Sequence, residues 1–224
     1  MDNKSAFNVN AYDENVRKVI PFYDEIYEQI ISVIKAYCGD NALSVLDTGS
    51  GTGTLGLKVY EELNLSELVL CDPSDKMLSD AKTKLKNSPC QFICAGSETL
   101  NFKSRFDVVT AIQSHHYFDR ATRETAVRNC YNALKSDGIF IYFENTAPFT
   151  ETGRKIMLCR LEEYQLSKDR SAEEVKSHLA RYNKEFFPIT ISEHFELLNK
   201  IGFKSSELFW HSYMQSGFYA IKGD

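Results

Sequence analysis

The stretch Val45-Leu46-Asp47-Thr48-Gly49-Ser50-Gly51-Thr52-Gly53 decides the fold. Residues 43–47 predict a buried strand that ends in an acid. The glycines that follow allow the backbone to turn sharply and to approach a ligand closely. A helix is predicted directly after the loop, over residues 54–63. A strand, a glycine-rich loop and a helix in this order are typical of a cofactor-binding turn.

The rest of the chain alternates short apolar runs with longer amphipathic stretches. Further strands are predicted over residues 67–72, 90–96, 105–112 and 138–145, and further helices over 74–86, 120–135 and 192–201. This alternation predicts an α/β fold with a mostly parallel sheet. Two last strands, 203–210 and 213–222, are separated by a short gap at His211-Ser212, which predicts a hairpin and an antiparallel edge.

Two helical segments lie outside this alternation. Residues 11–37 precede the first strand, and residues 150–187, rich in charges of both signs, follow the fifth. We expect one domain over residues 1–224. In it, residues 1–40 form a helical cap and residues 146–190 form a helical insertion or lid over the carboxyl edge of the sheet.

Composition excludes several classes of protein. The chain has 224 residues, with 26 basic and 31 acidic side chains, and this acidic balance argues against a nucleic-acid partner. No apolar run is long enough to span a membrane, and the N-terminus has no signal-peptide core, so we expect a cytoplasmic protein. The six cysteines form no CxxC pair, so no metal site is expected. A monomer and a homodimer both fit the sequence.

A second acid narrows the choice of cofactor. Asp72 ends the second predicted strand, where an acid typically accepts hydrogen bonds from the ribose hydroxyls of an adenosine cofactor. Gly51-x-Gly53-x-x-Gly56 satisfies the dinucleotide fingerprint literally. However, Asp47 at the mouth of the loop would repel a pyrophosphate. The pattern therefore favours a cofactor with an amino-acid tail and no phosphate.

At this point the sequence resembles a known family. LDTGSGTG (46–53) is similar to motif I of the class I S-adenosylmethionine-dependent methyltransferases. Four later segments resemble the family's following motifs in order: CDPSDKML (71–78), CAGSETLNF (94–102), FDVVTAIQSHHYF (106–118) and LKSDGIFIYFE (134–144). The resemblance implies a Rossmann-like seven-stranded methyltransferase sheet with an antiparallel last strand, and S-adenosyl-L-methionine as the cofactor.

The same resemblance implies which residues hold the cofactor. They are Tyr12, Asp47, Gly49, Ser50, Gly51, Gly53, Asp72, Pro73, Met77, Ser97, Glu98 and Gln113. The loop and Tyr12 would surround the methionine part, and Asp72 would hold the ribose. The adenine would contact Pro73 and Met77, with Ser97 and Glu98 near its edge. Many relatives carry Asp where this chain has Gly96, so the adenine amino group would be held by backbone groups or by Glu98 instead.

Candidates for catalysis follow the fourth and fifth predicted strands. His115, His116 and Glu144 would lie at the catalytic edge, where a histidine can serve as a general base. Structural roles for all three remain open. Methyl transfer to a thiolate or an amine needs little acid–base chemistry, because positioning supplies much of the rate.

Other side chains are candidates for the substrate side of the site. Tyr23 and Tyr27 can line a lid or pack in the core, and residues 210–215 can form an aromatic wall or an edge. Three arginines of the insertion, Arg154, Arg160 and Arg181, can hold an anionic substrate or pair with acids along solvated helices.

We expect an enzyme that transfers a methyl group from S-adenosylmethionine to a small molecule. Methylation of RNA or protein is the alternative within the same family. A nicotinamide-dependent oxidoreductase and a non-catalytic cofactor-binding protein are the alternatives outside it.

Overall fold

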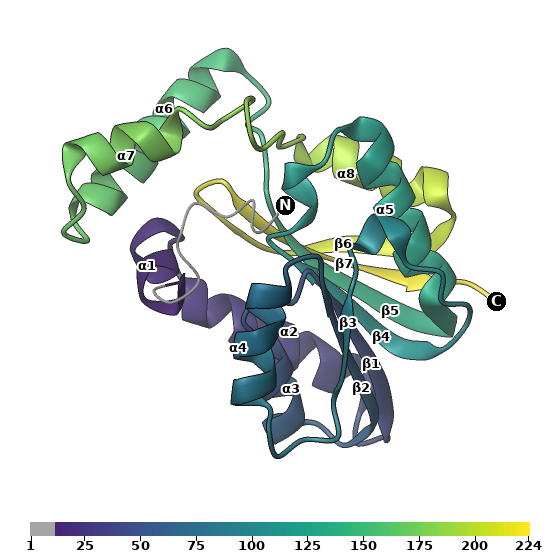
Figure 1. Cartoon of the computed structure of the whole chain (residues 1–224). Coiled ribbons are helices and arrows are strands. Elements are labelled where there is room, and N and C mark those ends of the chain that lie inside the picture. The colour runs from purple at the N-terminus through teal and green to yellow at the C-terminus, as the bar shows by residue number, and fades with distance from the viewer. Residues whose placement is uncertain (1–11) are drawn as a thin grey trace.

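A seven-stranded sheet between two layers of helices organises the chain, as shown by a computed structural model that describes residues 12–224 (Figure 1). The strands are β1 (Leu43–Thr48), β2 (Leu65–Asp72), β3 (Gln91–Cys94), β4 (Phe106–Ile112), β5 (Leu134–Asn145), β6 (Phe203–Ser212) and β7 (Gln215–Lys222). The helices are α1 (Tyr12–Val19), α2 (Tyr23–Cys38), α3 (Thr54–Glu62), α4 (Asp75–Lys84), α5 (Arg120–Ala133), α6 (Glu151–Leu166), α7 (Ala172–Leu179) and α8 (Ile191–Ile201).

The strands lie in the order β3-β2-β1-β4-β5-β7-β6. The first five pair in parallel, and β7 runs antiparallel to both of its neighbours. This topology confirms the predicted α/β fold and its antiparallel last strand. The direction of strand order reverses between β1 and β4, and ligands of open α/β sheets bind outside the carboxyl ends of the strands at such a reversal.

Each face of the sheet has its own apolar core. Helices α2, α3 and α4 contribute to the first cluster, in which Ile30 and Ile34 of α2 are fully buried. Helices α5 and α8 contribute to the second cluster, through residues such as Val127 and Leu198. The parallel strands are therefore covered on both faces, which explains why β1 is buried along its whole length.

The N-terminal segment is helical, as predicted for residues 11–37. It contains two helices, α1 and α2, with a break at Ile20, Pro21 and Phe22. Pro21 cannot donate a backbone hydrogen bond within a helix, and Phe22 adopts a left-handed conformation with φ of 59°. The chain therefore turns at this point, and residue 11 lies outside the described residues.

Two predicted boundaries were wrong. Helix α5 ends at Ala133, and β5 begins at Leu134, where residues 135–138 had been predicted as a helix end and turn. A register shift in the β4–β5 pairing and a positive φ of 54° at Asp137 absorb the extra residues. The final hairpin turns at Tyr213-Met214, two residues later than the predicted gap at His211-Ser212.

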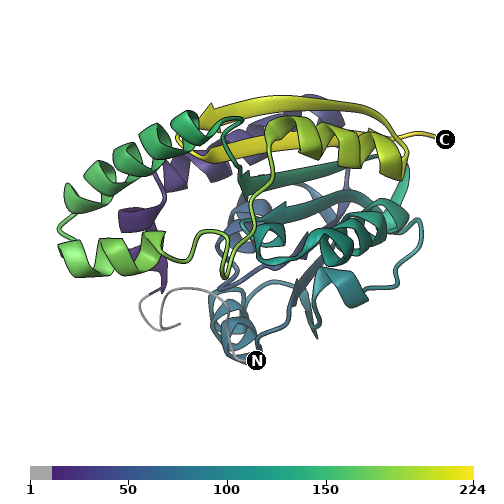
Figure 2. The same ribbon diagram turned by 90° about the horizontal axis from the view of Figure 1, so that it is seen from above.

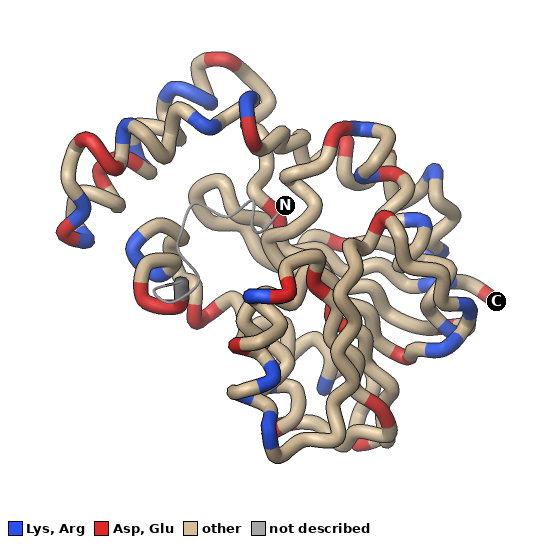
Figure 3. Tube along the Cα trace, in the orientation of Figure 1, with Lys and Arg blue, Asp and Glu red and all other residues tan. Residues whose placement is uncertain are grey.

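Helices α6 and α7 make up the segment between β5 and α8. Figures 1 and 2 both show them projecting from the same end of the sheet as α1. Basic and acidic residues are interspersed along both helices (Figure 3). The segment rejoins the body where the Phe187 backbone N–H donates to the carbonyl oxygen of His116 at 2.7 Å. Among residues 12–224, no helix combines the length and the apolar character that crossing a bilayer requires.

Candidate cofactor site

The glycine loop after β1 has a backbone shape that other residues would disturb. Gly49 has φ of +64°, and a Cβ there would lie 2.5 Å from the Cβ of Ser114. Gly53 has φ of +77°, and a Cβ there would lie 2.9 Å from the Cβ of Ala81 on α4. The loop therefore packs tightly between the end of β4 and α4, which leaves its backbone at the carboxyl edge of the sheet.

The carboxyl group of Asp47 is buried at the base of this loop. Its side chain is 2% exposed, and its Oδ1 accepts a hydrogen bond from the hydroxyl of Thr110 at 2.7 Å. Its Oδ2 is buried and has no partner among the described residues. Burial raises the pKa of Asp47 to about 7, and the negative charge of Asp72 adds to this rise against the opposing Thr110 hydrogen bond. Such an oxygen is suited to a positively charged partner.

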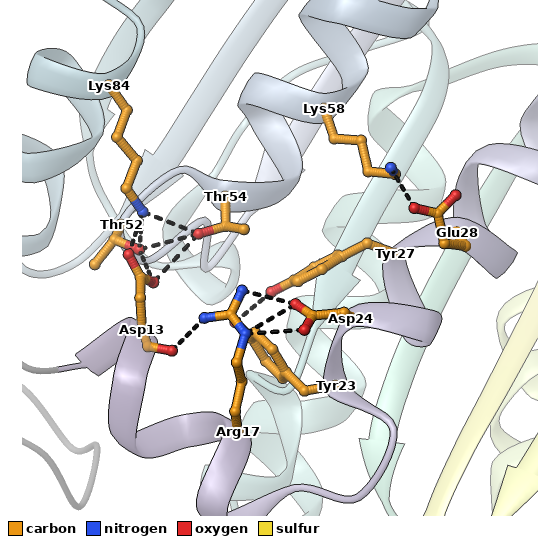
Figure 4. Close-up of polar contacts among 10 residues, drawn as sticks. All are labelled: Asp13, Arg17, Tyr23, Asp24, Tyr27, Glu28, Thr52, Thr54, Lys58 and Lys84. Carbon is orange, nitrogen blue, oxygen red and sulfur yellow. Dashed lines mark hydrogen bonds and ion pairs between the residues drawn. The ribbon is translucent and has the colours of Figure 1, made fainter.

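A small cavity lies next to Asp47. Its volume is about 30 Å³, and Tyr23 and Tyr27 of α2 form the wall opposite the loop. The two phenol oxygens are 2.5 Å apart (Figure 4). A volume of this size holds one or two groups as small as water, since a water molecule needs roughly 10–15 Å³ on the same measure. An ammonium group fits this space and the free oxygen of Asp47.

Asp72, at the end of β2, is held by the loop itself. Its Oδ2 accepts from the backbone N–H of Gly51 at 2.9 Å, and its Oδ1 accepts from the N–H of Ser74 at 2.8 Å. Burial raises its pKa, and these two backbone hydrogen bonds oppose the rise. Each carboxylate oxygen can accept a second hydrogen bond, so the carboxylate is oriented and can still receive two hydroxyls.

The predicted adenine residues lie around the ends of β2 and β3. Met77 is buried on α4, and Pro73 is exposed. Ser97 is buried, and its hydroxyl lies 3.0 Å from Nε2 of His115. A Cβ at Gly96 would meet the Glu98 carboxylate at 2.3 Å.

Glu98 therefore occupies the space that a side chain at position 96 would take. Its Oε2 is buried without a partner among the described residues. This is the arrangement expected if Glu98 substitutes for the acid that many relatives carry at the position of Gly96.

Gln113 lies directly after β4 in an unusual conformation. Its φ is +54°, and its side chain lines the cavity beside Asp47. Its amide nitrogen donates to the carbonyl oxygen of the Gln215 side chain, at the start of β7. A non-glycine residue in this region is strained, and such strain clusters at functional sites. Tyr12 is the first residue of α1, and its side chain lies outside the described part of the chain.

Three groups of the site correspond to three parts of S-adenosylmethionine, the cofactor that the sequence resemblance implies. The free oxygen of Asp47 and the small cavity match an ammonium group, Asp72 matches a pair of hydroxyls, and Glu98 matches an amino group. Among the predicted cofactor residues whose burial the structure describes, Pro73 is exposed and the others are buried or half-buried.

A buried hydrogen-bonded network near the ends of β4 and β5 contains the three candidate catalytic residues, His115, His116 and Glu144. Glu144 is fully buried; its Oε1 accepts from the backbone N–H of His115, and its Oε2 lies 3.0 Å from Nδ1 of His116. Burial opposes ionisation of Glu144, but the hydrogen bond from His116 and the nearby imidazoles lower its pKa to about 2. Burial lowers the pKa of His115 to about 4.

This network connects the end of the sheet to the segment that follows α7. The ring of His116 stacks edge-on against Phe186, and Arg123 donates to the carbonyl oxygen of Phe187. The three residues are thus brought together, with partners that suit a supporting role. A catalytic role for them stays a prediction.

The predicted substrate-side range 210–215 contains two aromatic residues, Trp210 and Tyr213, that pack against the N-terminal segment. Phe22 contacts Trp210 and Tyr213 of the final hairpin, at ring distances of 6.2 and 6.5 Å. The guanidinium of Arg160 lies 4.4 Å from the centre of the Tyr213 ring. Arg154 pairs with Glu151, and Arg181 pairs with Glu185, as expected for exposed helices.

The sequence analysis gave no role to Thr110 or Asp13, and it placed Gln215 only within the candidate range 210–215. Thr110 follows from the two-residue period of β4, which places it on the face of Asp47. Gln215 depends on the hairpin register and Asp13 on the placement of α1, so neither has a local sequence signal.

Comparisons with known proteins agree with this geometry. Residues 45–138 match the family described as methyltransferase domain. The chain is 25% identical over 200 residues to carboxy-S-adenosyl-L-methionine synthase of Nautilia profundicola, covering 89% of this chain and 85% of that protein. It is also 25% identical to the protein of the same name from Staphylococcus epidermidis, covering 98% and 96%.

A solved structure shares the fold. Magnesium protoporphyrin IX methyltransferase from Synechocystis, with bound S-adenosylhomocysteine, superposes with a TM-score of 0.66 at 14% identity and covers 92% of this chain and 86% of that one. The matched segment contains the glycine loop, Asp72, Glu98 and Gln113. S-adenosylmethionine is the cofactor of this family. Over residues 45–138 the chain therefore matches a methyltransferase domain, and its fold is that of a methyltransferase of known structure with bound S-adenosylhomocysteine.

Proposed function

We propose that this enzyme transfers the methyl group of S-adenosylmethionine to a small molecule whose nucleophile is the nitrogen of a neutral amine or the sulfur of a thiolate. The observation that carries the proposal is the buried, unpartnered oxygen of Asp47 beside a cavity the size of an ammonium group. Asp72, oriented by the N–H groups of Gly51 and Ser74, supports the same cofactor. The cofactor, when bound, supplies a methyl group already activated on a sulfonium.

The acceptor side of the site is lined by amides. Gln113 and Gln215 are hydrogen-bonded to each other, and Asn145 is the register partner of Gln215 in the β5–β7 pair. Because the Gln113 amide nitrogen is engaged by Gln215, the Gln113 carbonyl oxygen is left to accept a hydrogen bond. An N–H of an amine substrate is a suitable donor, and its lone pair would then be directed at the methyl group.

The titratable groups around the cavity fit a nucleophile that needs no base. Among the described residues that line it, Asp47, Tyr23 and Tyr27 are the titratable ones. Asp47 serves the cofactor in this proposal, and burial raises the pKa of Tyr23 well above its usual range. A hydroxyl acceptor would need a general base, whereas a neutral amine or a thiolate would not.

The enclosure of the site supports a small acceptor. Helix α1 touches α6 where the hydroxyl of Tyr164 donates to the carbonyl oxygen of Arg17 at 3.0 Å. Residues 1–40 and 146–190 would thus act as cap and lid within a single domain. Six free thiols fit a reducing compartment, in support of a cytoplasmic enzyme.

A second candidate reaction is favoured by the curated relatives. The two relatives described above span almost the whole chain and are named for the synthesis of carboxy-S-adenosyl-L-methionine. In that case the cofactor itself would be the molecule that is modified. The two reactions differ in product, so one experiment separates them.

The test supplies S-adenosylmethionine carrying a labelled methyl group, together with fractions of small amines and thiols, RNA, or protein. We expect label in the small-molecule fraction, and in Gln113→Ala a loss of turnover much larger than the loss of affinity for S-adenosylhomocysteine. Label only in RNA or protein, or mass-spectrometric detection of a carboxylated cofactor in place of methylated product, would overturn the proposal.

A further inference from the structure

A polar network fastens the first helix to the glycine loop (Figure 4). The carboxylate of Asp13, in the first turn of α1, accepts hydrogen bonds from the hydroxyls of Thr52 at 2.9 Å and Thr54 at 3.3 Å. The ammonium group of Lys84, at the end of α4, lies 2.5 Å from the other Asp13 oxygen. It also donates to both hydroxyls, at 2.9 and 3.0 Å. We call these four residues the Asp13 latch.

The latch is partly shielded from water. The side chains of Lys84 and Asp13 are 27% and 37% exposed, and Thr52 as a whole is 3% exposed. Burial acts against ionisation of Asp13, but the hydrogen bonds from Lys84 and Thr52 outweigh it and lower its pKa. The Asp13 carboxylate is therefore ionised at neutral pH, and charge-assisted hydrogen bonds to such a group are stronger than neutral ones.

Helix α1 depends on its neighbours for its position. It has eight residues, and a helix of this length is marginal on its own. Val16 and Val19 anchor it in the core, and an ion pair from Arg17 to Asp24 ties it to α2. Of these contacts, the latch is the one that joins α1 to the glycine loop.

The latch lies across the cofactor's methionine site. Thr52 and Thr54 both line the cavity beside Asp47, while Tyr23 and Tyr27 line its opposite wall. Helix α1 leads directly into α2, which carries the two tyrosines. Fixing α1 to the loop therefore holds both walls of the cavity together.

We propose that Asp13 and Lys84 are positioning residues that clamp α1 across the glycine loop and slow the release of the bound cofactor. They act through the loop and through α2, without touching the reacting atoms. The proposal rests on the cofactor alone and is independent of which molecule accepts the methyl group.

The test compares dissociation of S-adenosylhomocysteine from full-length variants by stopped-flow displacement. Lys84→Met keeps the length of the side chain and removes its charge, and Asp13→Asn removes the partner charge. We expect each to accelerate release on the order of tenfold, the scale of one lost charge-assisted network. Because both changes break the same contact, the double variant should release no faster than either single variant. Lys84→Arg should restore slow release.

A matched control is available on the same face of the molecule. Lys58 pairs with Glu28 and Glu62, its side chain is 23% exposed, and it links α3 to α2 away from the loop (Figure 4). Lys58→Met should leave the release rate within about twofold of wild type, as expected for a surface pair that does not touch the ligand site. Hydrogen exchange should show α1 amides protected by S-adenosylhomocysteine in wild type and less so in Lys84→Met.

Two results would overturn the proposal. One is release from Lys84→Met and Asp13→Asn at the wild-type rate, with unfolding free energies lowered only as in Lys58→Met; the latch would then be a stability contact. The other is equal acceleration in Lys84→Met and Lys58→Met. Binding of S-adenosylhomocysteine without methyl transfer to small molecules would count against the proposed acceptor alone.

Discussion

Asp47 is expected to lower the free energy of unfolding at neutral pH, because its carboxylate is buried and one of its oxygens has no partner among the described residues. Burial raises its pKa from 3.8 to about 7, so the folded state binds this proton more tightly than the unfolded chain does. Stability therefore falls as pH rises from about 4 to about 7. The shift of roughly 3 units corresponds to about 4 kcal/mol above pH 7.

The variant Asp47→Asn removes the charge and keeps the oxygen that accepts from Thr110. We expect its stability advantage over wild type to grow by about 3 kcal/mol between pH 5 and pH 8, from the same linkage relation. Urea denaturation at the two pH values measures this difference. S-adenosylhomocysteine at pH 8 should stabilise wild type and have little effect on the variant, since the carboxylate that binds its ammonium group is gone.

Asp107 provides a control of opposite sign. Burial acts to raise its pKa, but hydrogen bonds from Ser44 and Lys135 outweigh burial and lower it. The stability that wild type gains over Asp107→Asn should therefore build up as pH rises towards 3.8 and stay constant between pH 5 and pH 8. A stability difference between Asp47→Asn and wild type that does not change with pH would refute the reasoning about Asp47.

Three further predictions concern the loop, the adenine site and the buried network. Gly49→Ala should abolish binding of S-adenosylhomocysteine in calorimetry, because its Cβ would lie 2.5 Å from Ser114 at a φ of +64°. Glu98→Gln should weaken S-adenosylhomocysteine about tenfold but leave S-inosylhomocysteine, which lacks the amino group, unchanged; an equal loss for both would exclude the adenine contact. Glu144→Gln should lower stability at pH 7 by roughly 3 kcal/mol, because the pKa of Glu144 is lowered from 4.5 to about 2, and this loss should fade as pH falls from 4.5 towards 2. Cofactor affinity that falls in parallel with stability in Glu144→Gln would contradict a purely supporting role.

Local sequence signals were sufficient to predict that the candidate cofactor residues lie together at one edge of the sheet. Asp47, the glycines and Asp72 lie at strand ends within a short stretch, so the parallel sheet brings them together once the alternation of strands and helices is recognised. The lack of an acid at Gly96 was visible in the sequence, and the position of Glu98 explains it. A boundary prediction failed at the α5–β5 junction, where Asp137 with its positive φ redirects the chain.

Contacts between distant segments could not be predicted. Asp13 and Lys84 are 71 residues apart, and Gln113 and Gln215 are 102 residues apart. Each of these pairs depends on how a cap helix or a hairpin packs on the finished sheet. Neither has a periodicity or a motif that marks it in advance.

The central claim is that the glycine loop and the two acids bind S-adenosylmethionine. Calorimetric titration with S-adenosylhomocysteine tests it most directly, with a nicotinamide dinucleotide as the competing ligand. The account predicts micromolar affinity for the former, lost in Asp72→Ala and retained in Lys58→Met. Absence of binding to wild type, or unchanged affinity in Asp72→Ala, would contradict it.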